Sequence, residues 1–307
     1  MFGKYKSVIT LIVSVLLATV VGVFRGGSDV DDNLEAYQLY RIRWHHEFDM
    51  VLAGDSRLNQ GLSPATMRKI LPDYRIANFG WGHAVFGGEY LKALDGLIDP
   101  ESPRKVMVLG ISPLALTKMG YVDNEYTENK RKHPIETFEQ MFFKDFLYFF
   151  RPIEFQERSV LRIRGRLDRI KEFHPDGWAA ATMKPEKPRV SLSFFKSHYS
   201  KFKVSDEVIN ELLSYVGNWQ ESGISVYGFM MPTSPAMIEL EKVESGFNEK
   251  EFIEQFTEAG GKWINVVTDK YHSYDGNHLR KDEAVKFSRV FARALSRSIK
   301  KDSRKNR

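Results

Sequence analysis

The chain alternates short apolar runs with longer segments of helical periodicity. Between the apolar runs, segments such as 205–223 place apolar residues three and four positions apart, on one face of a helix. Short apolar runs separated by helices are typical of buried parallel strands. The pattern therefore predicts an α/β domain with a parallel sheet. The predicted strands lie at 48–54, 74–80, 105–112, 225–232 and 262–269.

Several predicted helices have recognisable ends. Ser63 precedes Pro64, which is the order of a helix cap followed by proline at the first helical position. Gly223 is placed to end the helix at 205–223, since glycine commonly follows the last turn. Two further helices are expected at 87–98 and 281–299.

Residues from about 119 to 200 interrupt this alternation, and we expect a helical insertion over the carboxyl edge of the sheet. Phenylalanines crowd residues 142–150, and Lys and Arg dominate residues 158–171. The aromatic cluster is either part of a core or a surface that meets lipid. The basic stretch is either a solvated helix face or a surface that attracts an anionic polymer or anionic lipid.

Composition fits a folded globular protein rather than a disordered one, with 42% hydrophobic and 28% charged residues in 307. The absence of cysteine excludes disulfides, thiol catalysis and cysteine metal sites. The net charge of +5 is not accompanied by a nucleic-acid-binding motif. Nucleic acid is therefore not expected as a partner.

The N-terminus carries a charge-free segment, 7–24, preceded by Lys4 and Lys6. About 18 apolar residues just suffice to cross a bilayer, and lysines before such a span favour a cytoplasmic N-terminus. The sequence after the segment is a poor signal-peptidase site. We therefore expect a single-pass protein of the cell membrane with a periplasmic or extracellular domain. Its parts are an anchor (1–26), a stalk (27–44), the α/β domain with its insertion (45–298) and a basic tail (299–307).

Candidate chemistry begins at Ser56, which follows Gly54 and Asp55 at the end of the first predicted strand. Reactive crevices of open parallel sheets lie beyond the carboxyl ends of the strands. Serine becomes a nucleophile only with a base, and the alternative is a helix cap. Asp275 and His278 stand three residues apart before the last helix, so one carboxylate can orient the imidazole. His278 could instead be a surface histidine, and His272 is a competing base.

With these two motifs in this order, the sequence resembles the SGNH (GDSL-like) hydrolase superfamily. The Gly-Asp-Ser turn is Gly54-Asp55-Ser56, and the C-terminal Asp-x-x-His motif is Asp275-Gly276-Asn277-His278. The resemblance covers about 45–115 and 205–298. It implies a three-layer flavodoxin-like fold, with Ser56 as nucleophile, His278 as base and Asp275 orienting it. It also implies that no metal or organic cofactor takes part.

The same resemblance implies an oxyanion hole formed by Ser56 N–H, a glycine N–H and an asparagine side chain. The glycine would be Gly82, chosen over Gly80 in "NFGWGHAVFGG". Where the family carries the asparagine, this chain has Ser112. Loss of one oxyanion donor can slow catalysis by roughly two to three orders of magnitude. This departure weakens the expectation of a vigorous general hydrolase.

Three functions remain open from the sequence. The anchor and the missing asparagine are similar to those of membrane-anchored polysaccharide O-acetylation proteins and lipoteichoic-acid D-alanylation proteins. That similarity implies an extracytoplasmic acyl transferase or esterase. Its substrates would be acyl groups, above all O-acetyl groups, on an anionic or glycan polymer, and its partner would be a multi-pass O-acyltransferase. The first alternative is a simple carboxylesterase that uses the same residues. The second is a catalytically silent scaffold for the membrane acyltransferase, in which Arg162, Arg166 and Arg169 make the contacts that matter.

Overall fold

The computed structural model describes residues 3–25, 30–118, 124–132 and 168–305. Its contacts divide the chain into two units, 1–40 with 131–166 and 41–130 with 167–307. The first unit contains α1 (Gly3–Arg25) and most of α2 (Val30–Ile42). Among the described residues, no helix combines the length and apolar character needed to cross a bilayer, so the predicted transmembrane helix is not supported.

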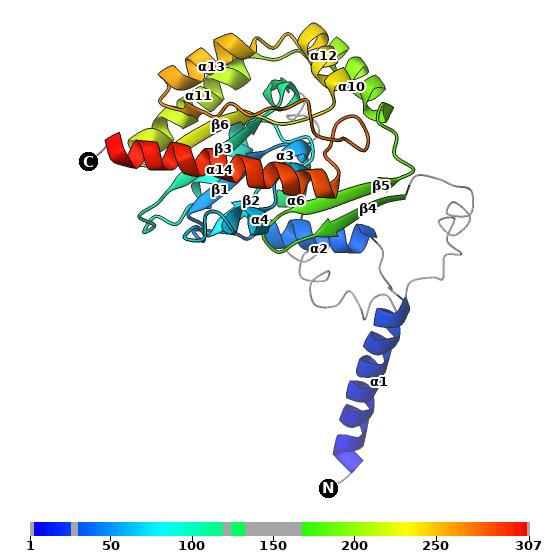
Figure 1. The fold of residues 1–307 in the computed structure, drawn as a ribbon. Coiled ribbons are helices and arrows are strands. Elements are labelled where there is room, and N and C mark those ends of the chain that lie inside the picture. Colours follow the sequence, from blue (N-terminus) through cyan, green and yellow to red (C-terminus); the bar gives the residue numbers. More distant parts are fainter. Residues whose placement is uncertain (1–2, 26–29, 119–123, 133–167, 306–307) are drawn as a thin grey trace. The chain divides into compact units, whose positions relative to one another are not determined.

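The second unit is built on a five-stranded parallel sheet (Figure 1). The strand order is β2-β1-β3-β6-β7, so the first strand in the sequence lies inside the sheet. Each strand falls within one of the five apolar runs, which confirms the predicted α/β class. The strands are β1 (Met50–Gly54), β2 (Ile76–Asn78), β3 (Val106–Ile111), β6 (Ser225–Met230) and β7 (Lys262–Trp263).

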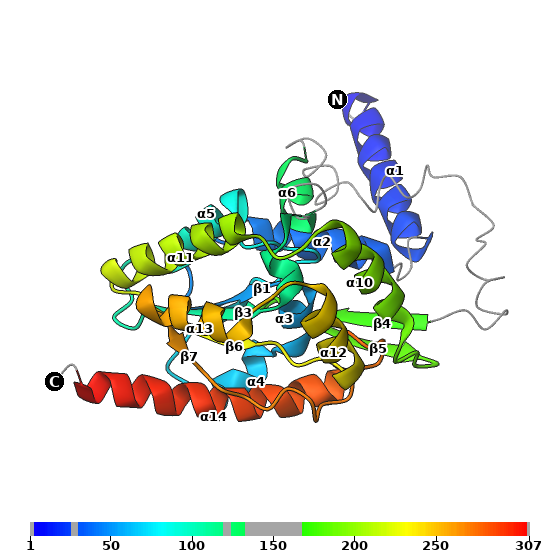
Figure 2. The same ribbon diagram turned by 90° about the horizontal axis from the view of Figure 1, so that it is seen from above.

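Helices cover both faces of this sheet, as Figure 2 shows with α5 and α11 on one side and α4 and α14 on the other. Along β1, Val51 and Ala53 join one apolar cluster, whereas Met50 and Leu52 join the other. This division follows from the two-residue period of a strand. The covering helices are α5 (Gly88–Asp95), α11 (Asp206–Glu221) and α13 (Glu249–Glu258) on the first face, and α3 (Ser56–Gly61), α4 (Pro64–Arg68) and α14 (Lys281–Lys305) on the second.

The prediction of a helical insertion was wrong for residues 168–184, which form an antiparallel hairpin of β4 and β5. Gly177 lies in its turn at φ +87°, where a side chain would be strained and would also collide with Asn78 O. Residues 119–123 and 133–167, with the aromatic cluster, Arg162 and Arg166, lie outside the described residues. The described elements of the insertion are α6 (Glu125–Lys130), β4 (Asp168–Phe173), β5 (Ala179–Lys184) and α10 (Val190–Lys201).

The last helix extends further than the sequence pattern suggested. α14 continues to Lys305, so most of the predicted basic tail at 299–307 is helical. Asp302 explains this extension, because it accepts a hydrogen bond from the Tyr227 hydroxyl at 2.6 Å and pairs with Lys262 at 3.0 Å. Both partners belong to the sheet, so they hold this end of the helix against it.

Asp49 stabilises the amino edge of the sheet, directly before β1. Its carboxylate accepts hydrogen bonds from Arg75 Nε and Nη2, at 3.0 and 2.7 Å, and from Ser102 Oγ at 2.6 Å. Hydrogen bonds from Arg75 lower the pKa of Asp49 to about 2, against an opposing effect of burial. The native state therefore binds a proton at Asp49 less readily than the unfolded chain does.

This shift gives a prediction for acid stability. The stabilisation from Asp49 is fully present above the unfolded pKa, 3.8, and is lost as the pH falls through the folded pKa, about 2. Asp49→Asn should lower the free energy of unfolding at neutral pH by about 1–2 kcal/mol, allowing for the half-exposed Arg75, and should match the wild type near pH 2.

Urea titrations of the two proteins between neutral pH and about pH 2 measure this difference. Asp73→Asn is the matched control, since Asp73 is 71% exposed and lies 3.4 Å from its partner Arg104. An equal loss for Asp49→Asn at every pH would rule out the proton linkage.

Candidate active site

Ser56 lies at the junction of β1 and α3, where the sheet approaches its carboxyl edge. Gly54 is needed there because a Cβ at this position would lie 2.7 Å from the carbonyl oxygen of Gly110. Asp55 is the cap of α3, and its Oδ1 accepts a hydrogen bond from Arg57 N at 2.8 Å. The capping role suggested as an alternative for Ser56 therefore falls to Asp55. The Ser56 hydroxyl is left for another partner.

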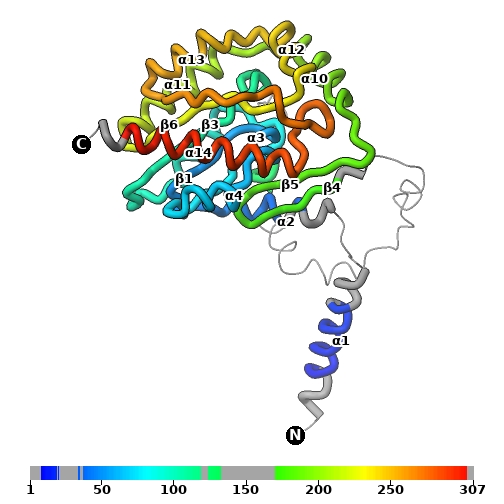
Figure 3. Tube along the Cα trace, viewed as in Figure 1, coloured from blue at the N-terminus to red at the C-terminus, as the bar shows by residue number. Residues whose placement is uncertain are grey.

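That partner is His278. Ser56 Oγ lies 2.8 Å from His278 Nε2, and His278 Nδ1 lies 2.7 Å from Asp275 Oδ2. The two segments are distant in sequence, and Figure 3 follows them as the blue β1–α3 trace and the orange segment before α14. Ser56, His278 and Asp275 thus form one continuous hydrogen-bonded chain. This is the arrangement that activates a serine for attack on an ester.

Asp275 is held in the ionised state by its own loop. Burial raises its pKa, but the charge of His278 and hydrogen bonds from the ring and the backbone outweigh burial, and the pKa lies well below its usual range. The backbone donors are Asn277 N at 2.9 Å and His278 N at 2.7 Å. An ionised Asp275 can only accept, so the proton of a neutral His278 ring lies on Nδ1. The lone pair of Nε2 then faces Ser56.

A cavity of about 310 Å³ opens beside Ser56 and His278. Two larger cavities, of about 520 and 440 Å³, are lined by neither residue. His83 lines the cavity beside Ser56. Its backbone has φ 52°, a strained conformation for a residue other than glycine, and its ring stacks on Phe194. The apolar part of the wall comes from Leu114, Met183, Val190, Phe194 and Phe195, of which all but Leu114 belong to the insertion.

The predicted oxyanion donors are only partly available in this structure. Gly82 N donates to Glu125 Oε2 at 2.9 Å, and the fully buried Ser112 donates its hydroxyl proton to Asp55 Oδ2 at 2.5 Å. Within the described part of the chain, the Ser56 N–H has no hydrogen-bond partner, as expected at the start of a helix. The structure therefore brings together Ser56, His278 and Asp275, but gives Gly82 and Ser112 other partners.

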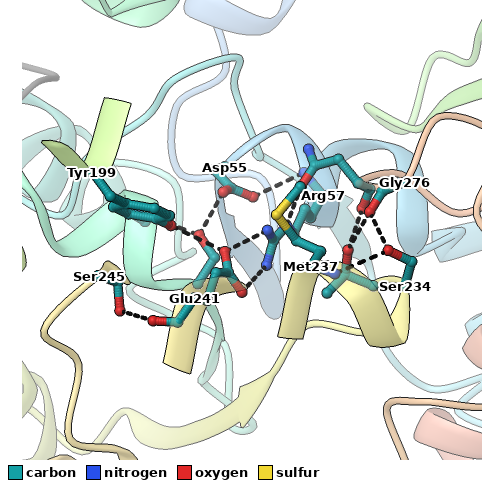
Figure 4. A network of polar contacts seen from close by, with 12 residues as sticks. Asp55, Arg57, Tyr199, Ser234, Met237, Glu241, Ser245 and Gly276 are labelled. Carbon is teal, nitrogen blue, oxygen red and sulfur yellow. Dashed lines mark hydrogen bonds and ion pairs between the residues drawn. The ribbon is translucent and has the colours of Figure 1, made fainter. Parts of the chain in front are cut away.

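A buried ion pair, absent from the sequence-based prediction, lies behind the site (Figure 4). Arg57 is 1% exposed and donates to both carboxylate oxygens of Glu241, at 2.5 and 3.1 Å. Burial lowers the pKa of Arg57, but the charge of Glu241 more than compensates, so the pKa is raised and the guanidinium stays charged. Tyr199 also donates to Glu241 at 3.0 Å. The network joins α3 to α10 (Val190–Lys201) and α12 (Pro235–Glu244).

Two other features of the sequence are resolved by the geometry. His272 Nε2 lies 2.6 Å from Glu186 Oε2 on a partly exposed surface, so it is not placed to activate Ser56. Asn277, inside the Asp-x-x-His motif, is not among the predicted site residues, although its side chain lies 3.1 Å from His278 Nε2. Its proximity in sequence to His278 was the available signal.

Over the described ranges, no group of three or more His, Asp or Glu residues is arranged to hold a metal ion.

In comparisons with known proteins, the chain matches no family model, no curated protein and no solved structure.

Proposed function

We propose that this chain is a serine esterase or acyl transferase of the SGNH type. The observation that carries the proposal is the chain of contacts from Ser56 through His278 to Asp275 at the carboxyl edge of a parallel sheet. The strand order β2-β1-β3-β6-β7 supports it, since five-stranded flavodoxin-like sheets have the order 2-1-3-4-5. The Gly-Asp-Ser turn lies near the start of this domain's sequence and the Asp-x-x-His loop near its end, and together they supply the residues of the site.

The proposed reaction uses the contacts among Ser56, His278 and Asp275. His278 Nε2 takes the proton of Ser56 as Oγ bonds to the ester carbonyl carbon, while Asp275 stabilises the imidazolium. The tetrahedral oxyanion is stabilised by the Ser56 N–H at the helix N-terminus. His278 then returns its proton to the departing alkoxide oxygen, which leaves an acyl-serine. A sugar hydroxyl or a water molecule completes the cycle by the same steps in reverse order.

The cavity favours an acyl group as the part of the substrate that enters the site. Its volume, about 310 Å³, and its wall of Phe194, Phe195, Val190, Leu114 and Met183 suit a small apolar group. An acetyl ester of a cell-envelope polymer is the substrate that the family resemblance implies. The periplasmic or extracellular location likewise stays a prediction from residues 4–24.

A silent scaffold is the second candidate, and the oxyanion region favours it. Gly82 N–H is bound to the Glu125 carboxylate and the Ser112 proton to Asp55, so neither is directed at a substrate oxygen. An oxyanion would have to displace Glu125 to reach the Gly82 N–H. A protein of this kind would keep the contacts among Ser56, His278 and Asp275 but would not turn over a substrate. Of the arginines assigned to that role, only Arg169, in β4, lies in the described part of the chain.

Labelling with a fluorophosphonate distinguishes the two candidates, because this reagent phosphonylates only an activated serine. We expect one adduct, on the tryptic peptide Trp44–Arg57, which contains Ser56. Ser56→Ala should abolish it. Ser191→Ala is the matched control, since Ser191 lines the same cavity and should leave labelling unchanged. Absence of any adduct, or an adduct that persists in Ser56→Ala, would favour the scaffold.

A further inference from the structure

The Nε2 atom of His278 faces two hydrogen-bond donors rather than one. Ser56 Oγ lies 2.8 Å from it and Asn277 Nδ2 lies 3.1 Å from it. A neutral ring with its proton on Nδ1 has a single lone pair at Nε2 for both donors. The serine and the amide therefore share one acceptor.

The orientation of the Asn277 amide is fixed by Arg57. Arg57 Nε donates to Asn277 Oδ1 at 2.7 Å, and a guanidinium has no acceptor atom. The oxygen of the amide must consequently face Arg57, and the NH2 group must face His278. Arg57 cannot turn away, because Glu241 binds its other nitrogens in the same buried network.

We propose that Asn277 is a positioning residue that opposes protonation of His278 at Nε2 and so sets the pH at which Ser56 can be activated. The neutral ring accepts from the amide. The protonated ring can donate its Nε2 proton to Ser56 Oγ, but it can no longer accept from the amide, whose N–H atoms then face a positively charged ring. The catalytic consequence rests on the proposed function, whereas the effect on the ring does not.

Asn277 acts against a strong opposing influence. Asp275, ionised and 2.7 Å from Nδ1, favours the charged ring. Arg57 adds a positive charge behind the amide, which Glu241 balances. On the remaining sides, the ring of Tyr274 stacks on that of His278 with centroids 6.0 Å apart, and His83 lines the same cavity. The amide and the Ser56 hydroxyl are neutral groups that contact Nε2 directly, and replacing the amide tests the proposal with Ser56 and the other named partners in place.

The test is an NMR titration of the His278 ring in the full-length chain labelled with ¹⁵N-histidine, with the resonance assigned by its loss in His278→Gln. Asn277→Asp keeps an acceptor for Arg57 but turns a carboxylate oxygen toward Nε2. We expect the titration midpoint to rise by more than about one pH unit. Asn277→Ala removes the donor to Nε2 together with the acceptor for Arg57 Nε, and should raise the midpoint by roughly half a unit to one unit.

Asn218→Asp is the matched control, since it makes the same change on the exposed side of α11 and should leave the midpoint unchanged. Midpoints that agree with the wild type in Asn277→Asp would overturn the proposal, and this variant decides the matter should Asn277→Ala fail to fold. Where the chain hydrolyses an ester, the acid limb of kcat/KM should move with the ring. A chain without turnover would contradict the proposed function but leave the titration to decide this inference.

Discussion

Ser56→Ala is expected to slow the catalysed hydrolysis of p-nitrophenyl acetate, by up to about 10⁶-fold in kcat for an efficient enzyme. The reason is that Ser56 Oγ is the atom placed 2.8 Å from His278 Nε2, and alanine leaves the base with nothing to activate. The fold should persist, because Asp55 and not Ser56 caps α3. The measurement is initial rate against ester concentration for the full-length proteins.

Two comparisons make the Ser56 result interpretable. Ser191→Ala removes a hydroxyl from the same cavity and should retain the wild-type rate. Adding a glycan acceptor separates transfer from hydrolysis, since a transferase should release p-nitrophenol faster and a hydrolase should not respond. A wild-type rate that survives in Ser56→Ala would exclude the serine mechanism. Equal background rates in both proteins would favour the scaffold.

Glu241→Gln is expected to lower the free energy of unfolding by about 3–5 kcal/mol, because it leaves the Arg57 charge buried without its counter-ion. Arg57 is 1% exposed and cannot reach water, and an arginine guanidinium keeps its proton in proteins, so it does not neutralise by losing one. Glutamine keeps the length of the side chain but has one acceptor oxygen where Glu241 uses two, so its NH2 group would face an Arg57 nitrogen. The loss therefore reports the missing charge and the missing acceptor rather than a cavity. Urea unfolding measured by circular dichroism gives the difference.

The control for this second result lies two residues away on the same helix. Glu239 is exposed, and Glu239→Gln should change the free energy of unfolding by less than about 0.5 kcal/mol. Replacing both partners with apolar residues, Arg57→Met with Glu241→Leu, should recover part of the loss, since the unpaired charge is removed. A loss under 1 kcal/mol in Glu241→Gln would mean that water or another group reaches Arg57.

The sequence predicted the parts of this protein that depend on local patterns. Each strand lies in one of the apolar runs, and Ser56, Asp275 and His278 meet because parallel strands and the loop before α14 share one edge of the sheet. The hairpin at 168–184 was missed because its turn depends on Gly177 fitting against Asn78 O, a contact between distant segments.

The buried network shows a second limit of prediction from sequence. Arg57 and Glu241 are 184 residues apart, and each alone has the appearance of an ordinary surface charge. The oxyanion donors show the same limit. The prediction of Gly82 rather than Gly80 depended on how the glycines are aligned with the family motif. The group that accepts the hydrogen bond of the Gly82 N–H is the Glu125 carboxylate, 43 residues further on. No local pattern carries information about such pairs.

The site joins two residues 222 positions apart, which has a consequence for a chain made from its N-terminus onward. At about 5–20 residues per second, roughly 10–45 s separate the synthesis of Ser56 from that of His278. Throughout that interval the serine is an ordinary alcohol with no base beside it. On the proposed mechanism, a nascent chain therefore carries no activated serine, and Ser56 gains its base only after residue 278 has been made and its loop has docked.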